Sequence, residues 1–135
     1  MRKIRSQGVI LLEDKVLIAR HYNYKNNEEF WLLPGGSLKE NETSEEALIR
    51  EIKEETNLDI ELDTNFKKTI TYFINSKQVF KDSVYFVATP ITFDLKSQEG
   101  EIEECIWCSY DEVLDKLEFE NSKEVFKEAY KYIKD

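Results

Sequence analysis

Three glutamates in the first half of the chain are spaced so that one side of a helix would carry all of them. At about 100° per residue, Glu51, Glu54 and Glu55 fall within an arc of about 100° on the helix predicted over residues 44–56. Like charges this close repel, so either the pKa values rise or a cation neutralises the group. Carboxylate oxygens without a nearby histidine or cysteine select hard ions such as Mg²⁺ or Mn²⁺, which bind phosphate oxygens and activate water. A solvated acidic helix face is the alternative that the composition alone allows.

The glutamates sit within a longer spaced pattern, and the spacing is what favours a functional site. The pattern is Gly36, five residues, Glu42, seven residues, and then Arg50-Glu51-Ile52-Lys53-Glu54-Glu55-Thr56-Asn57-Leu58. This many specified positions rarely recur by chance, even in a Glu-rich chain. On the same helix, Arg50 lies within i,i+4 reach of both Glu46 and Glu54. The arc beside the glutamates carries the residues expected to be buried, which are Leu48, Ile49, Ile52 and Thr56.

This pattern resembles the Nudix box, G-x5-E-x7-R-E-U-x-E-E-x-G-U with U aliphatic. The resemblance extends over most of the chain, because a strand pair, the entry Leu32-Leu33-Pro34-Gly35-Gly36 and a late Glu-rich segment ending at Trp107 are similar to the common layout. It implies an α/β/α sandwich, with a mixed sheet between helices. It also implies a pyrophosphohydrolase that cleaves the diphosphate linkage of a nucleoside diphosphate derivative, with Mg²⁺ or Mn²⁺ as the cofactor.

Each residue that matches the box takes an implied role. The implied metal ligands are Glu51, Glu54, Glu55 and the carbonyl of Gly35. Arg50 would orient the glutamates, while Glu42 and Gly36 would support the loop and the helix.

Asn57 is the one departure, since the box has Gly at that position. Gly suits a left-handed helix end, and Asn is the residue that most readily replaces it there. We therefore expect Asn57 to support the box at a cost below about 1 kcal/mol, with no ligand lost.

A general base is expected among the glutamates of the loop before the last strand. Similar enzymes take a glutamate from this region, and residues 99–104 offer four candidates. Glu101, six residues before Trp107, is the favoured one. A box glutamate, chiefly Glu54, is the alternative.

Substrate contacts are expected at the end of the second predicted strand. Arg20 and His21 would contact phosphate, with a plain surface cation as the alternative for Arg20. Tyr22, Tyr24 and Phe30 could stack on a base, although such aromatic residues also fill core and loop contacts. His21 is the only histidine, which argues against most His-based zinc sites and against a Ser-His-Asp relay.

The elements that would position these residues are strands before and after the box helix. Apolar runs and turn signals predict strands over residues 4–12, 16–22, 68–74, 79–89 and 102–108, with a short run at 30–33. The first two strands suit a hairpin, and 75–77 suits a turn. The last part is predicted to be helical, with one apolar face formed by Val125, Ala129, Tyr132 and Ile133. The fold class is therefore α/β or α+β, with a mixed sheet packed between helices.

The box helix has predicted ends. Thr43 and Glu46 fit a capping box at its start, and Asn57 fits a left-handed cap at its end, with Leu58 in reach of Ile52.

Length and charge limit the class of protein. A chain of 135 residues predicts one domain over 1–135, and its apolar residues form no run near the roughly 18 needed to cross a bilayer. We expect a soluble cytoplasmic protein without membrane contact, either a monomer or a homodimer. With 28 acidic and 19 basic side chains, the net charge of −9 argues against binding a nucleic-acid backbone. A small nucleotide that arrives with a cation remains compatible with this charge.

Cys105 and Cys108 form a C-x-x-C motif without a second pair to complete a zinc site. In the strand predicted there, residues three apart point to opposite faces, so two ordinary half-buried thiols are favoured over a redox or metal role.

The substrate is the least determined feature. Pro is absent from the roughly 15 residues after Leu58, where ADP-ribose hydrolases carry one, and the NADH-type and coenzyme A-type signatures are also missing. Nucleoside triphosphates, including oxidised ones, are the default, ahead of dinucleoside polyphosphates and nucleotide sugars. A Nudix-like module that binds a nucleotide or ADP-ribose without turnover is the alternative function, and an acidic interaction protein is a third.

Overall fold

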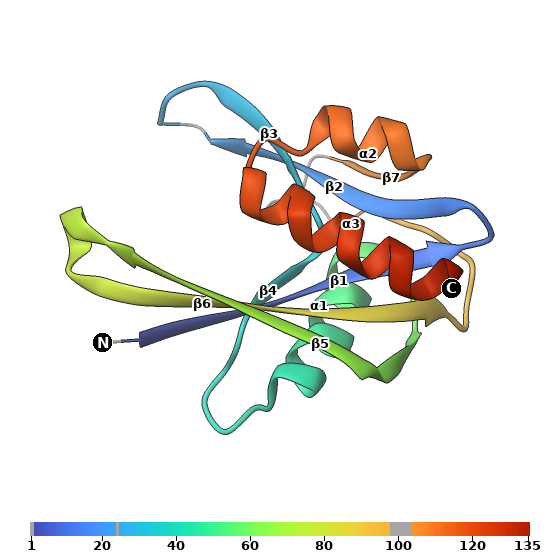
Figure 1. Cartoon of the computed structure of the whole chain (residues 1–135), viewed down its shortest axis with the longest axis horizontal. Coiled ribbons are helices and arrows are strands. Elements are labelled where there is room, and N and C mark those ends of the chain that lie inside the picture. The colour runs from blue at the N-terminus through green and yellow to red at the C-terminus, as the bar shows by residue number, and fades with distance from the viewer. Residues whose placement is uncertain (1, 24, 98–103) are drawn as a thin grey trace.

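The computed structural model describes residues 2–23, 25–97 and 104–135 (Figure 1). The elements in chain order are β1 (Arg2–Leu12), β2 (Lys15–Asn23), β3 (Glu28–Leu32), β4 (Gly35–Ser37), α1 (Ser44–Thr56), β5 (Ile60–Ile74), the 3₁₀ turn η1 (Asn75–Lys77), β6 (Val79–Pro90), β7 (Glu104–Cys108), α2 (Tyr110–Lys116) and α3 (Glu120–Lys134). No helix in these described ranges is long and apolar enough to span a membrane.

The strands form one mixed sheet, as the sequence predicts. Its main path has the order β3-β2-β1-β6-β5, while β4 pairs with β1 and β7 pairs with β2. The long β1 and β6 strands run parallel, and the other pairings are antiparallel. The turn at η1 joins β5 and β6 into a hairpin that projects from the body of the molecule (Figure 1).

The predicted hairpin of β1 and β2 exists only next to its turn. These strands pair at Leu11 with Val16 and at Leu12 with Lys15, and then they separate. Beyond the split, β1 pairs with β6 and β4, whereas β2 pairs with β3 and β7. Residues 33–34 connect these two groups of strands, because β3 pairs with β2 and β4 pairs with β1. Two groups of strands therefore diverge from a common corner.

Helices cover both faces of the sheet. One apolar cluster joins the sheet to α1 through Leu48 and Ile52, and the other joins it to α3 through Val125, Phe126 and Ala129. Figure 1 shows α3 in front of the strands and α1 behind them. This layered α+β arrangement confirms the predicted fold class.

Helix α1 has the ends that the sequence predicts. The Thr43 hydroxyl accepts a hydrogen bond from the amide of Glu46, whose carboxylate accepts one from the amide of Thr43. At the other end, Asn57 is left-handed, with φ 67°. Leu58 and Ile52 are fully buried in the same cluster. Ile49, in contrast, is 43% exposed, because the buried stripe is narrower than expected.

Three boundaries differ from the prediction. β5 begins at Ile60 rather than at residue 68, since its mostly polar first part is held by pairing with the end of β6, across a bulge between Asp63 and Lys67. Residues 35–37 form β4 against β1, although Pro34-Gly35-Gly36 is a sequence typical of a turn. The helical end divides into α2 and α3 around Leu117, which is buried and bridges to Trp31.

Candidate functional site

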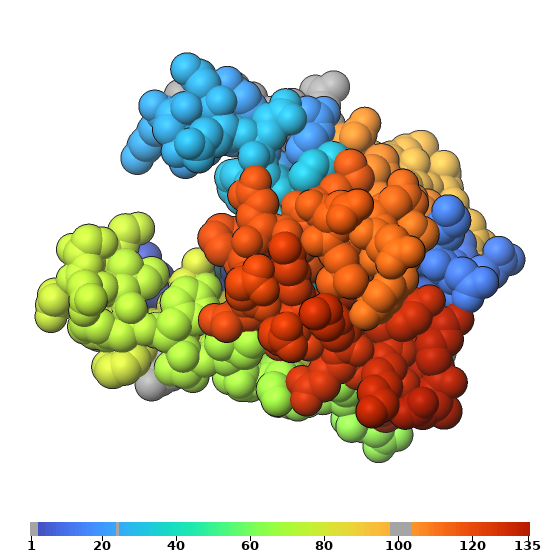
Figure 2. Space-filling view, turned by 45° about the horizontal axis from the view of Figure 1, so that its top comes forward, coloured from blue at the N-terminus to red at the C-terminus, as the bar shows by residue number. Residues whose placement is uncertain are grey.

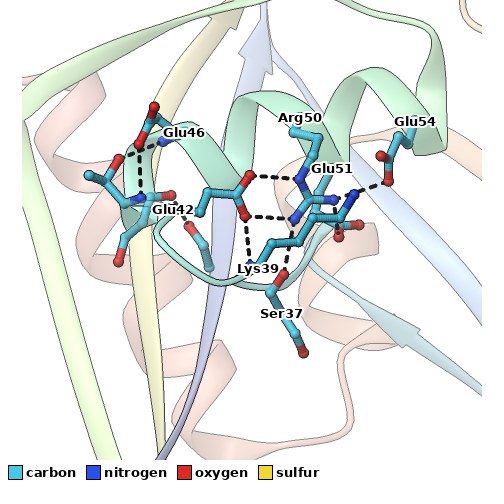
Figure 3. Close-up of polar contacts among 10 residues, drawn as sticks. Ser37, Lys39, Glu42, Glu46, Arg50, Glu51 and Glu54 are labelled. Carbon is cyan, nitrogen blue, oxygen red and sulfur yellow. Dashed lines mark hydrogen bonds and ion pairs between the residues drawn. The ribbon is translucent and has the colours of Figure 1, made fainter.

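Arg50, in the middle of α1, connects acidic side chains of the helix with one from the loop before it (Figure 3). Its Nε and Nη2 donate to the two carboxylate oxygens of Glu42 at 2.7 and 2.8 Å. Its Nη1 donates to Glu51 at 2.8 Å and to Glu54 at 3.2 Å. Nη2 also donates to the carbonyl of Ser37 at 3.1 Å. One planar guanidinium therefore fixes three carboxylates and the end of β4.

Glu46 does not join this network, although the helix spacing put it within reach of Arg50. Its carboxylate is taken by the helix cap, where it accepts from the amide of Thr43 at 2.9 Å.

Glu42 and Arg50 stabilise each other in their charged forms. The hydrogen bonds from Arg50, followed by one from the amide of Lys39, lower the pKa of Glu42 from 4.5 to about 2. The same Glu42 bonds, supported by Glu51, raise the pKa of Arg50 above its ordinary value. Glu42 is therefore a carboxylate at neutral pH, and it holds Arg50 in place for the other acids.

Gly36 leaves the space that the Glu51 carboxylate occupies. A Cβ atom at position 36 would lie 2.3 Å from Cδ of Glu51, which is closer than two carbons can approach. The Glu51 side chain is 14% exposed and lines the cleft described below. The missing side chain therefore lets a carboxylate from α1 reach β4.

Gly35 brings a second box carboxylate to the same strand. Its amide donates to Oε1 of Glu55 at 3.1 Å, and Glu55 is 3% exposed. Gly35 itself has φ 152°, and a Cβ there would lie 2.0 Å from the carbonyl oxygen of Ser6. Only glycine fits this position.

A cleft of about 990 Å³ opens beside β4. Figure 2 shows it as the hollow between the β2–β3 hairpin, in light blue, and the β5–β6 hairpin, in lime green. The residues that line it come from eight elements and the loop before α3, and they are Arg5, Gln7, His21, Tyr22, Phe30, Leu32, Gly35, Gly36, Ser37, Glu51, Glu55, Ile70, Tyr72, Lys81, Ser83, Tyr85, Phe119, Asn121 and Ser122. Box carboxylates and aromatic rings therefore border one space that is large enough for a nucleotide.

His21 and Phe30 form an aromatic wall of this cleft. They are cross-strand partners in β2 and β3, and their rings stack with centroids 5.4 Å apart and an interplanar angle of 12°. Tyr22 also lines the cleft, and its hydroxyl donates to Asn27 at 2.9 Å. Tyr24 lies outside the described residues.

Arg20 is placed differently from its neighbours. It forms ion pairs with Glu29 at 2.7 Å and with Glu104 at 3.9 Å, and it is absent from the residues that line the cleft. Its predicted phosphate contact therefore stays a prediction, and so do the phosphate contact of His21 and the base stacking of Tyr22.

The donors at the cleft edge have the chemistry that a hard cation requires. Glu51 and Glu55 supply carboxylate oxygens beside the Gly35–Gly36 backbone, and all of these groups offer oxygen as the donor atom. Glu54 is 44% exposed and does not line the cleft. In the described part of the chain, no three acidic, histidine or cysteine side chains converge into a ready metal cluster. These oxygen donors fit a hard cation. The third box carboxylate, that of Glu54, is bound by Arg50 outside the cleft.

Glu101, the favoured general base, lies outside the described residues. Glu104, at the start of β7, faces Arg20.

Comparison with known proteins agrees with this geometry. The model of the Nudix domain matches residues 2–129. The chain belongs to the Nudix family. It is 32% identical over 93 residues to an 8-oxo-dGTP diphosphatase of Buchnera aphidicola, an alignment that covers 69% of this chain and 68% of that protein. It also matches three Arabidopsis thaliana Nudix hydrolases, and there the matched region spans only about a third of their length.

Solved structures share the fold. A Caenorhabditis elegans Ap4A hydrolase superimposes with a TM-score of 0.81 at 19% identity, covering 97% of both chains. A Nudix-family hydrolase from Clostridium perfringens superimposes with a TM-score of 0.68 at 29% identity, covering 96% of both.

Asn57 shows how this Nudix chain accommodates its departure from the box. The amide of Asn57 donates to the carbonyl of Lys53 at 3.0 Å, as a left-handed cap does. Its side-chain Nδ2 donates to the carbonyl of Asp94 at 3.0 Å, a contact that glycine could not make. The substitution therefore keeps the backbone geometry and adds a tether to the loop after β6.

The two cysteines point to opposite faces of β7, as predicted for this strand, but both are buried and not half-buried. Cys105 belongs to the cluster under α1, and Cys108 belongs to the cluster under α3; both are buried and free. Burial, followed by the charge of Glu55, raises the pKa of the Cys105 thiol to about 12. Such a thiol is a packing group, because the reactive thiolate is scarce at neutral pH.

Sequence reasoning did not find several residues of the Nudix cleft, notably Arg5, Gln7 and Lys81. They come together because β1 pairs in parallel with β6, which places Arg5 beside Ser83 and Gln7 beside Tyr85. No local signal in the sequence indicates this pairing.

Proposed function

We propose that this chain hydrolyses the diphosphate linkage of a nucleoside diphosphate derivative, with Mg²⁺ or Mn²⁺ as the cofactor. The observation that carries the proposal is the arrangement of Glu51 and Glu55, which reach the Gly35–Gly36 strand at the edge of the cleft. The substrate's phosphates would lie at this edge, with the base toward the aromatic wall of His21 and Phe30.

Glu51 and Glu55 would hold the cation, with the Gly35 carbonyl and Glu54 as further ligands. When bound, the cation offsets charge on the phosphoryl group and lowers the pKa of a bound water. The carbonyl of Gly35 faces the guanidinium of Arg5, at 3.4 Å from Nη2.

Arg50 positions the acids rather than touching the substrate. Its two bonds to Glu42 fix the plane of the guanidinium, and Nη1 then sets the carboxylates of Glu51 and Glu54. A lysine could not reproduce this fork, because it presents one point charge instead of five planar donors.

A carboxylate would accept the proton of the attacking water. We propose Glu101 for this role, with Glu54 as the alternative. Glu54 is the most exposed carboxylate bound to Arg50, so its second oxygen is accessible to solvent.

Nucleoside triphosphates, including oxidised ones, are the proposed substrates. The similarity to the Buchnera protein named 8-oxo-dGTP diphosphatase supports this choice. A nucleotide also suits a protein of net charge −9, since its phosphates can arrive with their magnesium.

The test measures phosphate and pyrophosphate release from a nucleotide panel with Mg²⁺. Removing a carboxylate that binds the cation or the water is expected to lower the rate by about 10²-fold or more. The variants are Glu51→Gln, Glu54→Gln and Glu55→Gln. Glu45→Gln is the matched control, because Glu45 lies on the same helix and faces Lys67 at 3.9 Å.

Equal rates for the wild type and all three box variants would contradict the proposal. Saturable nucleotide or ADP-ribose binding without any turnover would instead favour a binding module.

A further inference from the structure

Within the described part of the chain, Arg5 and Lys81, in the cleft, differ from the other partly buried cations in lacking a partner for their charge. Arg20, Arg50 and Lys123 form ion pairs, and Lys116 lies over the ring of Trp31 at 4.6 Å. Arg5 and Lys81 are also half-buried, but within the described ranges neither of them pairs with a carboxylate or an aromatic ring. Partial burial of an uncompensated charge is unfavourable, so an anion from outside the chain is the complement that these residues lack.

Arg5 and Lys81 share one face of the sheet. Arg5 pairs with Ser83 across β1 and β6, and Lys81 lies two residues before Ser83. Since side chains alternate along a strand, positions 81 and 83 point the same way, about 7 Å apart. Both cations line the cleft together with Ser83.

The register also places them relative to the box carboxylates. Ser37 pairs with Arg5 on one side of β1, and Ser83 pairs with Arg5 on the other. With strands about 4.8 Å apart, β6 lies about 10 Å from β4, and Arg5 lies between them. Gly36, which Glu51 meets, pairs with Ser6 and therefore faces the other side of the sheet from Arg5. Glu51, Arg5 and Lys81 nevertheless line the same cleft, which extends from β4 to β6.

The donor capacity of Arg5 is largely unused. Its guanidinium has five N–H donors, and the one hydrogen bond described for it is the 3.4 Å contact from Nη2 to the carbonyl of Gly35. An arginine held at one edge in this way keeps its fork available for phosphate oxygens.

We infer that Arg5 and Lys81 bind phosphate groups beyond those at the box carboxylates, so that the site selects nucleotides with three or more consecutive phosphates. A nucleoside diphosphate joined to a neutral group has no anion to place at Lys81. This inference rests on the proposed function, because it assumes that the scissile diphosphate lies at Glu51 and Glu55.

The test compares the binding of two ligands by calorimetry in Mg²⁺, using a non-hydrolysable α,β-methylene triphosphate of adenosine and ADP-ribose. Lys81→Met is expected to lower the preference for the triphosphate about tenfold, the effect of losing one charged hydrogen bond. Lys81→Arg should keep most of that preference. Lys77→Met is the matched control, because Lys77 is an exposed lysine on the same hairpin that does not line the cleft.

Melting temperatures of all variants establish that each one is folded. An unchanged preference in a folded Lys81→Met protein would overturn the inference, and so would a wild type that prefers ADP-ribose.

The calorimetry and the hydrolysis assay together distinguish failure of the phosphate subsite from failure of the proposed function. If the wild type hydrolyses nothing yet shows a Lys81-dependent preference, the proposed function is wrong and the phosphate subsite stands. If it hydrolyses nucleotides and Lys81→Met leaves the preference intact, the subsite is wrong and the proposed function stands.

Discussion

Arg50 is the residue that binds the most polar groups around the box helix. Its guanidinium binds Glu42 through two nitrogens and reaches Glu51, Glu54 and the Ser37 carbonyl with the donors that remain. Glu42 therefore acts on the cleft indirectly, because it holds Arg50, and Arg50 holds the carboxylate of Glu51. The titration of Glu42 measures the strength of its interaction with Arg50.

Glu42→Gln is expected to lower stability in a pH-dependent way. The pKa of Glu42 in the folded protein is about 2, below its ordinary 4.5. The stabilisation is therefore complete above about pH 4.5 and is lost as the pH falls towards 2. Urea unfolding of wild type and variant between pH 7 and pH 3 should show a difference in free energy of unfolding that shrinks below pH 4.5. A difference that stays constant over this range would contradict the assigned pKa.

At the scale of single elements, α1 is the helix whose ends are set by its own sequence. Its first turn is closed by the capping box of Thr43 and Glu46, and its last turn by the left-handed Asn57. These signals are local, which is why the sequence predicts this helix with its boundaries. The end at Asn57 also binds the loop after β6 through the carbonyl of Asp94.

Asn57→Ala and Asn57→Gly separate the two contributions of this cap. Alanine loses the side-chain hydrogen bond and is unfavourable in the left-handed region, so we expect a loss of about 2 kcal/mol. Glycine loses the same bond but relieves the backbone, so its net change should stay below about 1 kcal/mol. Thermal or urea unfolding of both variants gives the comparison. Equal losses would mean that the backbone conformation contributes little.

The strands show where prediction from sequence stops. Residues 60–67 read as polar, yet they form the first part of β5, because the end of β6 supplies their partners. Likewise, Pro34-Gly35-Gly36 is a turn signal, yet residues 35–37 form β4 because they pair with β1. The box residues could be found since they follow one helix period. Arg5 and Lys81 could not, because a parallel pairing between distant strands brings them together.

At the scale of the whole molecule, two apolar clusters on opposite faces of the sheet account for folding. One includes Phe126 and Val87, and the other includes Phe86 and Ile52. The box carboxylates lie outside both clusters, so we expect the fold to persist without a cation in the site. Metal removal should therefore separate activity from structure.

Treatment with EDTA is expected to abolish nucleotide hydrolysis while the far-UV circular dichroism spectrum stays the same. The melting temperature should fall by no more than about 3 °C, which corresponds to the loss of a weakly bound ion from the folded state. Added Mg²⁺ or Mn²⁺ should restore the rate. Loss of the dichroism signal in EDTA would show that the cation is structural, contrary to this expectation.

Residues 33–34 cross between the two diverging groups of strands. An insertion or deletion at this crossing is expected to be poorly tolerated. These residues carry the strand path from Leu32, which pairs with Ala19 on β2, to Gly35, which pairs with Gln7 on β1. One inserted residue there would shift β4 by one step and turn its side chains to the other face. Gly36 would then no longer lie beside the carboxylate of Glu51, and a different residue would lie there. The distal turn at η1 has no such coupling, so length variation can accumulate at the rim of the cleft while the crossing keeps a fixed length.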